Sequence, residues 1–223
     1  MSSSSSPPRG RRPRIDRART LRTALDLLDR SGLDALTMRR LADAMDVQAG
    51  ALYRYYATKQ DLLMAMAEHM VGGVAEAAAA TGDTVWSERL VALARALRAA
   101  LLAHRDGARV FAGTHATGAH TLGFAETVVG VLRKAGFSDD DAARTLFTVA
   151  NFTVGHTLEE QAALSAHGAE PSSPDVLRAA VTPRDHPHLH ATLSALTDTD
   201  FDQLFEFGLN LLVDGLRARH RPV

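Results

Sequence analysis

The segment 36–63 constrains the fold more than any other part of the chain, because it holds two short helical patterns separated by only a few residues. Thr37 is a suitable N-cap for the first pattern, and Leu36 is placed to pack on Leu41 as a hydrophobic staple. Asp46 stands where the chain must turn sharply, and Asp is one of the few residues other than glycine that tolerate a left-handed backbone. The sequence therefore predicts a helix, a tight turn and a second helix.

The second helix, expected over residues 48–56, is short enough for its faces to be assigned. Leu52 and Tyr56 lie four residues apart and are predicted to face inward. Two helices joined by a tight turn form a helix-turn-helix, whose second helix enters the major groove of DNA. Small residues at its start let the backbone approach the duplex closely, and Arg54 can donate two hydrogen bonds to a guanine edge. The residues left toward solvent or DNA are Gly50, Ala51, Tyr53, Arg54 and Tyr55.

The run from Leu36 to Leu63, LTMRRLADAMDVQAGALYRYYATKQDLL, resembles the signature of the tetracycline repressor (TetR) family. It departs from that signature mildly, since Asp46 replaces the usual Gly of the turn and Tyr56 stands where Phe is common. The resemblance implies a bacterial repressor that binds operator DNA through this segment. The candidates for base-edge contacts that it implies are Arg39, Ala49 and Arg54, and those for phosphate contacts are Thr37, Tyr53, Tyr55, Thr58 and Lys59.

Alternative roles remain open for three of these residues. Tyr53 and Tyr55 would instead pack partly against the first helix of the chain, which is expected to end at Gly32, and Lys59 would be a solvated charge at a helix start. A module of this size reads only a few base pairs, so useful specificity takes two copies on a pseudo-palindromic operator. We therefore expect a homodimer.

Basic residues are concentrated near the N-terminus, although the formal net charge is only -1. Residues 1–60 hold twelve of the 25 Lys and Arg but six of the 26 Asp and Glu, a balance typical of a DNA-contacting module or of a solvated face without function. The first residues are Ser, Pro and Arg, which predicts a disordered arm that either contacts DNA or is an idle tail. The expected parts are the arm over 1–13, a helix-turn-helix domain over 14–58, and a ligand-binding and dimerisation domain over 59–223.

Helical periodicity dominates the rest of the chain, and no convincing strand pattern is present, so we predict an all-α protein. Two apolar stripes predict helices, the first with Gly32 as its stop: Ala18, Leu21, Leu25 and Leu28, then Leu90, Leu93, Leu97 and Leu101. Three pairs have capping-box spacing: Thr58 with Asp61, Ser138 with Asp141, and Thr199 with Asp202. Gly, Ser and Pro make 165–187 the expected mobile loop.

The resemblance extends through the second part of the chain, where 104–114, 136–138 and 152–161 are similar to segments of the tetracycline-binding members of the family. In those members a His and a Glu help to hold the magnesium ion that accompanies the drug. The Glu matches Glu159, but the His falls on Phe111, which cannot bind a metal. The polar drug contacts fall on apolar residues, namely Ala75, Leu93, Leu97 and about Val128. We therefore expect a fairly apolar organic effector and no metal or other cofactor.

The expected effector pocket combines apolar residues with a polar edge formed by His115 and Glu159. The other lining candidates are Leu97, Leu101, Phe111, Thr114, Phe124, Val128, Asn151 and Phe152. The alternative for most of these apolar residues is that they are simply core.

The last helix, expected over 200–217, carries too many apolar residues for one stripe, so it must be covered on two sides. Together with a helix over 138–163 it is expected to form the homodimer interface that the family uses. Gly208 and Gly215, seven residues apart, would permit close helix approach.

Other classes of function find little support in the sequence. No nucleophile paired with a base and no phosphate-binding loop is recognisable, so an enzyme is not expected. In HPHLH, residues 186–190, Pro187 favours a turn over the strand that would cluster the imidazoles, which argues against a metal site. No cysteine, membrane-spanning run or secretory signal is present, so a cytoplasmic location is expected. An activator, or a regulator without an effector, stays open as the alternative function.

Overall fold

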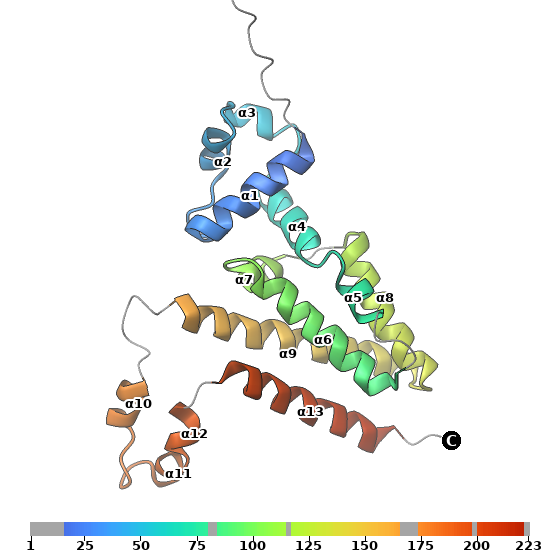
Figure 1. Cartoon of the computed structure of the whole chain (residues 1–223), viewed down its shortest axis with the longest axis vertical. Coiled ribbons are helices and arrows are strands. Elements are labelled where there is room, and N and C mark those ends of the chain that lie inside the picture. The colour runs from blue at the N-terminus through green and yellow to red at the C-terminus, as the bar shows by residue number, and fades with distance from the viewer. Residues whose placement is uncertain (1–15, 80–83, 115–116, 166–173, 198–199, 221–223) are drawn as a thin grey trace, which may run out of the picture.

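The computed structural model describes residues 16–79, 84–114, 117–165, 174–197 and 200–220. Throughout this described part the regular structure is helical and contains no strand, which confirms the all-α prediction. Figure 1 shows a small group of helices from the start of the chain above a larger group. We call residues 16–70 the head and residues 71–220 the body. The predicted arm, 1–13, lies outside the described residues.

The head consists of α1 (Arg17–Ser31), α2 (Met38–Ala44), α3 (Ala49–Leu52) and α4 (Lys59–Met70). The body consists of α5 (Val74–Ala79), α6 (Trp86–Leu102), α7 (Gly107–Ala112), α8 (Ala119–Lys134), α9 (Asp139–Ser165), α10 (Pro174–Ala180), α11 (Pro187–Ala191), α12 (Leu193–Thr197) and α13 (Phe201–Arg219). The structure has two buried clusters of apolar side chains, one in the body and one in the head, and the head cluster also includes Val110 of α7.

The turn and caps of the helix-turn-helix form as predicted. The Thr37 side chain accepts a hydrogen bond from the Arg40 backbone N–H and caps α2. Asp46 has a φ of 55°, the left-handed conformation expected for the turn. Thr58 and Asp61 form both halves of a capping box at the start of α4. Local chemistry therefore fixes where these helices begin and end.

One position of a predicted helix face and one predicted cap were wrong. In α1, Leu25 and Leu28 of the predicted stripe are buried and Leu21 packs against them, but Ala18 is exposed, and the other buried residues are Thr20 and Ala24. At α13 the cap is Asp200, which accepts a hydrogen bond from the Gln203 backbone N–H, and not the predicted Thr199, which lies outside the described residues.

The core of the head extends into α4, whose Leu62, Met66 and Met70 are buried against the other head helices. In α6 the predicted stripe is confirmed, because its four leucines are at most 1% exposed. The predicted boundary between the helix-turn-helix domain, 14–58, and the ligand-binding domain, 59–223, stays a prediction. Helix α4 begins at Lys59, just after that boundary, and packs with the head.

The helices α10 to α12 lie apart from the rest of the body in Figure 1. The described residues of these helices are exposed or half-buried. Pro187 is the first residue of α11, so HPHLH begins a short helix and does not form the predicted turn. Part of the expected loop over 165–187 is likewise helical, as α10.

Candidate DNA-binding surface and effector region

The short helix α3 presents an exposed face to solvent and an apolar face to the head core. Leu52 is fully buried and Tyr56 is 6% exposed, as predicted, and the Tyr56 hydroxyl donates a hydrogen bond to the Arg17 carbonyl oxygen. The helix itself spans four residues, shorter than the predicted 48–56, because the chain leaves it for a turn after Leu52. Tyr53 and Arg54 stand on that turn and are exposed.

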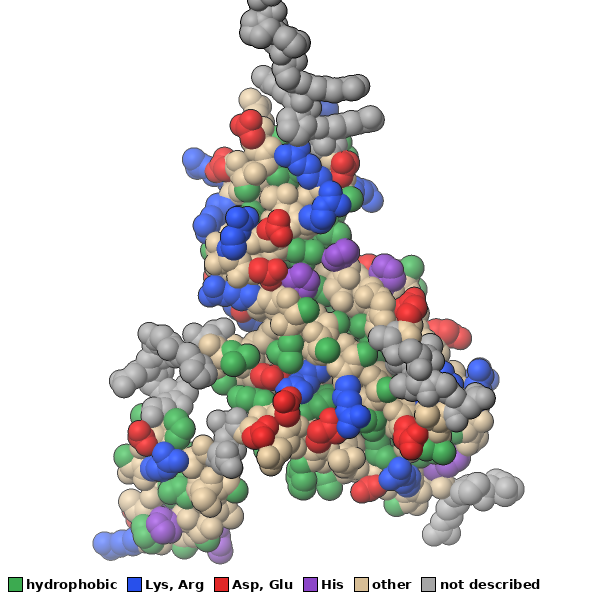
Figure 2. Space-filling view, viewed as in Figure 1, with side chains coloured by type: hydrophobic (Ala, Val, Ile, Leu, Met, Phe, Trp, Pro, Cys, Tyr) green, Lys and Arg blue, Asp and Glu red, His purple; other side chains and the backbone are tan. Residues whose placement is uncertain are grey.

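The predicted DNA contacts divide into exposed and partly buried residues. Two of the partly buried candidates, Ala49 and Tyr55, pack against the head core. This favours the packing alternative for Tyr55, whereas Tyr53 is exposed, which does not favour that alternative. Figure 2 shows Lys and Arg side chains gathered over the head. The exposed candidates are Thr37, Arg39, Gly50, Tyr53, Arg54 and Thr58, and the partly buried ones are Ala49, Ala51, Tyr55 and Lys59.

The apolar candidates for the effector region come together in the body core. Leu97 and Leu101 of α6 and Phe124 and Val128 of α8 are buried there. Phe111 and Phe152 are partly buried against them, and Thr114 is half-buried, its hydroxyl donating to the Phe111 carbonyl oxygen. This cluster is compatible with both the pocket and the core interpretation.

The two polar candidates that the structure describes, Asn151 and Glu159, do not join that cluster within one copy of the chain. Asn151 and Glu159 are exposed on α9, and His115 lies outside the described residues. The side of α9 that packs inward carries Thr153 and Thr157, which are fully buried. Asn151 lies two residues from Thr153, and Glu159 two from Thr157, a separation that turns a side chain to the far side of a helix.

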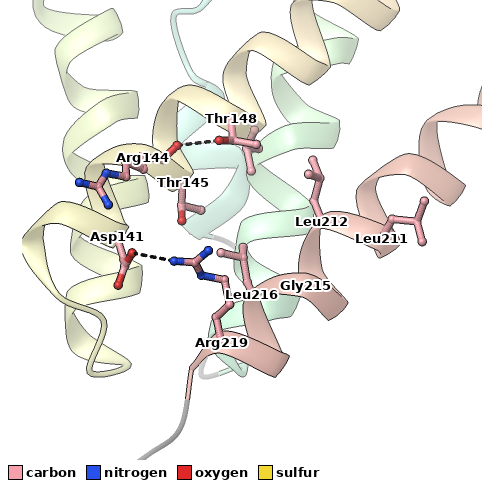
Figure 3. Close-up of a pocket in the computed structure, with 10 residues that line it drawn as sticks. Asp141, Arg144, Thr145, Thr148, Leu211, Leu212, Gly215, Leu216 and Arg219 are labelled. Atoms are coloured by element: carbon pink, nitrogen blue, oxygen red, sulfur yellow. Dashed lines mark hydrogen bonds and ion pairs between the residues drawn. The ribbon is translucent and has the colours of Figure 1, made fainter.

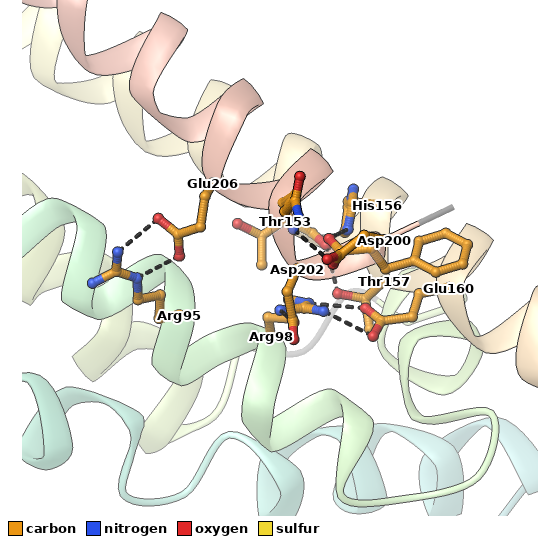
Figure 4. Close-up of polar contacts among 11 residues, drawn as sticks. Arg95, Arg98, Thr153, His156, Thr157, Glu160, Asp200, Asp202 and Glu206 are labelled. Atoms are coloured by element: carbon orange, nitrogen blue, oxygen red, sulfur yellow. Dashed lines mark hydrogen bonds and ion pairs between the residues drawn. The ribbon is translucent and has the colours of Figure 1, made fainter. Parts of the chain in front are cut away.

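An ionic cluster that is buried only at Arg98 and Glu160 joins α6, α9 and α13 (Figure 4) and was not predicted. The Arg98 guanidinium donates to both carboxylate oxygens of Glu160 at 2.8 Å and pairs with Asp202 at 2.6 Å. Arg95 donates to both carboxylate oxygens of Glu206, which lowers the pKa of that carboxyl through the hydrogen bond and in spite of partial burial. The spacing of Arg95 and Arg98 is visible in the sequence, but their partners lie more than sixty residues away.

Polar contacts join the end of α1 to the turn between α6 and α7. The Asp29 carboxylate accepts from the Arg105 backbone N–H and lies 3.0 Å from His104 Nδ1. The Asp106 carboxylate accepts from the Leu33 backbone N–H at 2.7 Å. Arg109 donates to Asp34, and this hydrogen bond and charge lower the pKa of the Asp34 carboxyl. The head is thereby tied to the body at a second place besides α4.

The same turn is also held from inside the body by one side chain of α9. The Gln161 carbonyl oxygen accepts from the Ala108 backbone N–H at 3.0 Å. Its amide donates to the backbone carbonyl oxygens of Leu101 and His104. Gln161 is 8% exposed, so one buried side chain joins α9 to the end of α6 and to the start of α7 on either side of the turn that contacts the head.

Helices α9 and α13 lie side by side and carry an exposed apolar face. Phe147 and Phe207 are each 66% exposed, and Leu204 and Leu211 are also exposed. A groove of about 370 Å³ between the two helices is open on this face (Figure 3). Of the two glycines singled out above, Gly208 packs against Phe152 of the same chain and has no room for a Cβ atom, whereas Gly215 lines the groove.

None of the helices in the described ranges combines the length and the continuous apolar character that a membrane span requires. The same residues contain no group of three or more His, Cys, Asp or Glu side chains arranged to hold a metal ion.

Comparisons with known proteins match both parts of the chain. Residues 21–66 match the model of bacterial regulatory proteins of the tetR family, and residues 78–220 match the tetracyclin repressor-like C-terminal domain. These families comprise transcription regulators, which are not enzymes. The tetracycline repressor protein class A from transposon 1721 of Escherichia coli is 41% identical over 203 residues, 91% of each chain.

Solved structures agree with these matches. A possible TetR family transcriptional regulator from Streptomyces coelicolor A3(2) is 73% identical, with a TM-score of 0.86, over 92% of this chain and 100% of that one. A variant of TetR from Acinetobacter baumannii AYE, solved in complex with minocycline, is 30% identical with a TM-score of 0.72, over 94% of this chain and 100% of that one.

Proposed function

The chain belongs to the TetR family of bacterial transcription regulators, and from this membership we propose that it is a cytoplasmic repressor that binds a pseudo-palindromic operator as a homodimer and is released by a small, fairly apolar organic effector. The proposed DNA binding is supported above all by the segment around α3, which has one buried face and one exposed face. Leu52 and Tyr56 hold it to the head, while Tyr53 and Arg54 are exposed, as is Arg39 of α2. An exposed arginine at this place can read a guanine in the major groove.

The dimer half of the proposal is supported by the exposed apolar face of α9 and α13. Aromatic side chains such as Phe147 and Phe207 are costly to leave in water, and a contiguous apolar patch on a protein surface marks an interface. A second copy related by twofold symmetry would cover the same face of both chains. We expect Phe207→Asp to convert the dimer to monomers in sedimentation experiments and to remove tight operator binding.

The effector half is supported by the composition of the body cluster. Phe111 and its apolar neighbours offer no ligand for the magnesium ion of a tetracycline complex, although the relatives include tetracycline repressors. An apolar guest would bind by displacing or separating α6, α7 and α8. The turn after α6 would carry that change to Asp29 of the head and Arg109 of α7 would carry it to Asp34, and the two heads would leave operator spacing.

An electrophoretic mobility-shift assay tests this proposal. Duplexes are selected from a random-sequence pool by the purified protein, and candidate apolar compounds are then added to the complex. We expect a palindromic consensus whose half-site centres are about 34–36 Å apart or a multiple of that, and release by at least one compound. Failure to enrich any sequence would contradict operator binding.

A regulator without an effector is the alternative. It is favoured if no compound raises the melting temperature of the protein, because a ligand that binds only the folded state must raise it. Release of DNA by tetracycline with magnesium would contradict the proposed class of effector.

A further inference from the structure

The carboxylate of Glu68, on α4, lies at the first turn of α8 in the body. It accepts hydrogen bonds from the backbone N–H groups of His120 and Thr121 and, at 2.7 Å, from the Thr121 hydroxyl. The first N–H groups of a helix have no partner within that helix, and the positive end of its dipole favours a negative charge. The Glu68 side chain of α4 therefore supplies the hydrogen-bond acceptor and the negative charge that the first turn of α8 lacks.

The fit around this carboxylate is close. A Cβ atom added at Gly118 would collide with the Glu68 carboxyl group, so only glycine lets the side chain lie there. The Glu68 backbone carbonyl oxygen also lies 3.2 Å from Nδ1 of His120. Although burial raises the pKa of the Glu68 carboxyl, hydrogen bonds from Thr121 and His120 outweigh it and leave that pKa lowered. The contact is thus made by the charged form.

Each end of this contact is fixed in a different core. On α4, Met66 and Ala67 precede Glu68 and are fully buried in the head. On α8, Phe124 and Val128 follow Thr121 and are buried in the body cluster where we place the effector. Packed apolar surfaces can slide past each other, whereas several hydrogen bonds to one carboxylate fix both position and direction.

We propose that Glu68 is the positioning residue through which α8 sets the angle of the DNA-reading head. This inference rests on the proposed function, and it adds a route from the effector region to DNA that does not pass through the turn between α6 and α7. Without the contact, α4 would hold the head over a wider range of angles. Operator affinity would then fall by about fivefold to tenfold, a typical size for coupling between two sites.

The absence of cysteine allows a direct test on the full-length dimer. Asp43→Cys, at an exposed position of α2, receives one nitroxide label per chain, and pulsed dipolar spectroscopy measures the distribution of distances between the two heads. Glu68→Gln and Thr121→Val weaken the contact, while Thr121→Ser keeps the hydroxyl. Glu126→Gln, at an exposed position of α8, is the matched control for removal of a charge. Affinity is measured on the duplex selected by the parent protein.

We expect a broader distribution and weaker operator binding for Glu68→Gln, a smaller change for Thr121→Val, and parent behaviour for Thr121→Ser and Glu126→Gln. Unchanged distance and affinity in both Glu68→Gln and Thr121→Val would overturn the inference, as would an equal change in Glu126→Gln. A parent protein that shows no dipolar signal or selects no duplex would instead refute the proposed function, and the inference would fall with it.

Discussion

In the head, the fully buried core side chains and the arginines proposed to read DNA are different residues, whereas in the body the residues expected to meet the effector largely are the core. Leu52 and Leu41 are fully buried, while Arg39 and Arg54 are exposed. In the body, by contrast, Leu97 belongs to the buried cluster and to the expected pocket at once.

This difference determines what a mutation can reveal. In the head, fold and DNA binding can be changed separately. In the body, a change of the expected pocket is also a change of packing, so that loss of response to an effector has two explanations. The predictions below test how far this separation holds.

The largest effect is expected in the body. Leu97→Ala removes a fully buried side chain from the body cluster and should lower the free energy of unfolding by about 2–5 kcal/mol, as measured by urea denaturation of the purified protein. Leu97→Met keeps the volume and should cost less than about 1.5 kcal/mol. A cost below about 1 kcal/mol for the alanine variant would mean that the cluster already contains free space, which would favour the pocket over the core.

A smaller effect, confined to binding, is expected in the head. Arg54→Ala should weaken binding to the selected duplex by about 1–3 kcal/mol, since a bidentate contact with guanine contributes that much to discrimination. Its melting temperature should stay that of the parent, because the side chain is exposed. Arg30→Ala, at the end of α1, is the matched control and should bind as the parent does. Equal losses in both variants would indicate a general effect of charge.

The same difference explains how much could be predicted from the sequence. The turn at Asp46 and the caps at Thr37 and Thr58 depend on neighbours within four residues, so local chemistry was sufficient to predict them. Whether Tyr53 and Tyr55 are exposed or packed could not be predicted from the sequence, because a short helix leaves both orientations open. Only the structure separates the exposed Tyr53 from the packed Tyr55.

Contacts between distant segments were beyond such reasoning. Glu68 meets Thr121 across 53 residues and Arg98 meets Glu160 across 62, and no pattern in a single sequence pairs them. The polar edge of the expected pocket came from a resemblance, which places Glu159 on a helix but not against a particular neighbour. In one chain that side chain faces outward.

A third prediction concerns the ionic contact between α6 and α13. Because the folded protein has a lowered pKa at Glu206, this contact stabilises the fold above the ordinary glutamate pKa of about 4.3 and is lost as the pH falls through the lower folded value. Both partners are partly exposed, so Glu206→Gln should cost less than about 1 kcal/mol at pH 7.

The cost should shrink at pH 3.5 in urea denaturation series that compare parent and variant. Glu126→Gln, at an exposed position of α8, is the control for removal of a charge. If the loss of unfolding free energy in Glu206→Gln stayed constant with pH, the assignment of that loss to this ion pair would be contradicted.

The smallest effects are expected at Asn151 and Glu159, the polar residues that α9 turns away from its own core. Exposed substitutions usually change the free energy of unfolding by less than about 0.5 kcal/mol, so Asn151→Ala and Glu159→Gln should unfold as the parent does. The decisive comparison repeats both variants on the Phe207→Asp background. If either costs more than about 1 kcal/mol in the dimer and nothing in the monomer, the partner subunit covers that residue. The polar edge of the expected pocket would then belong to a site built from two copies of the chain. In the body, the pocket residues would then be distinguished from the core residues only in the dimer.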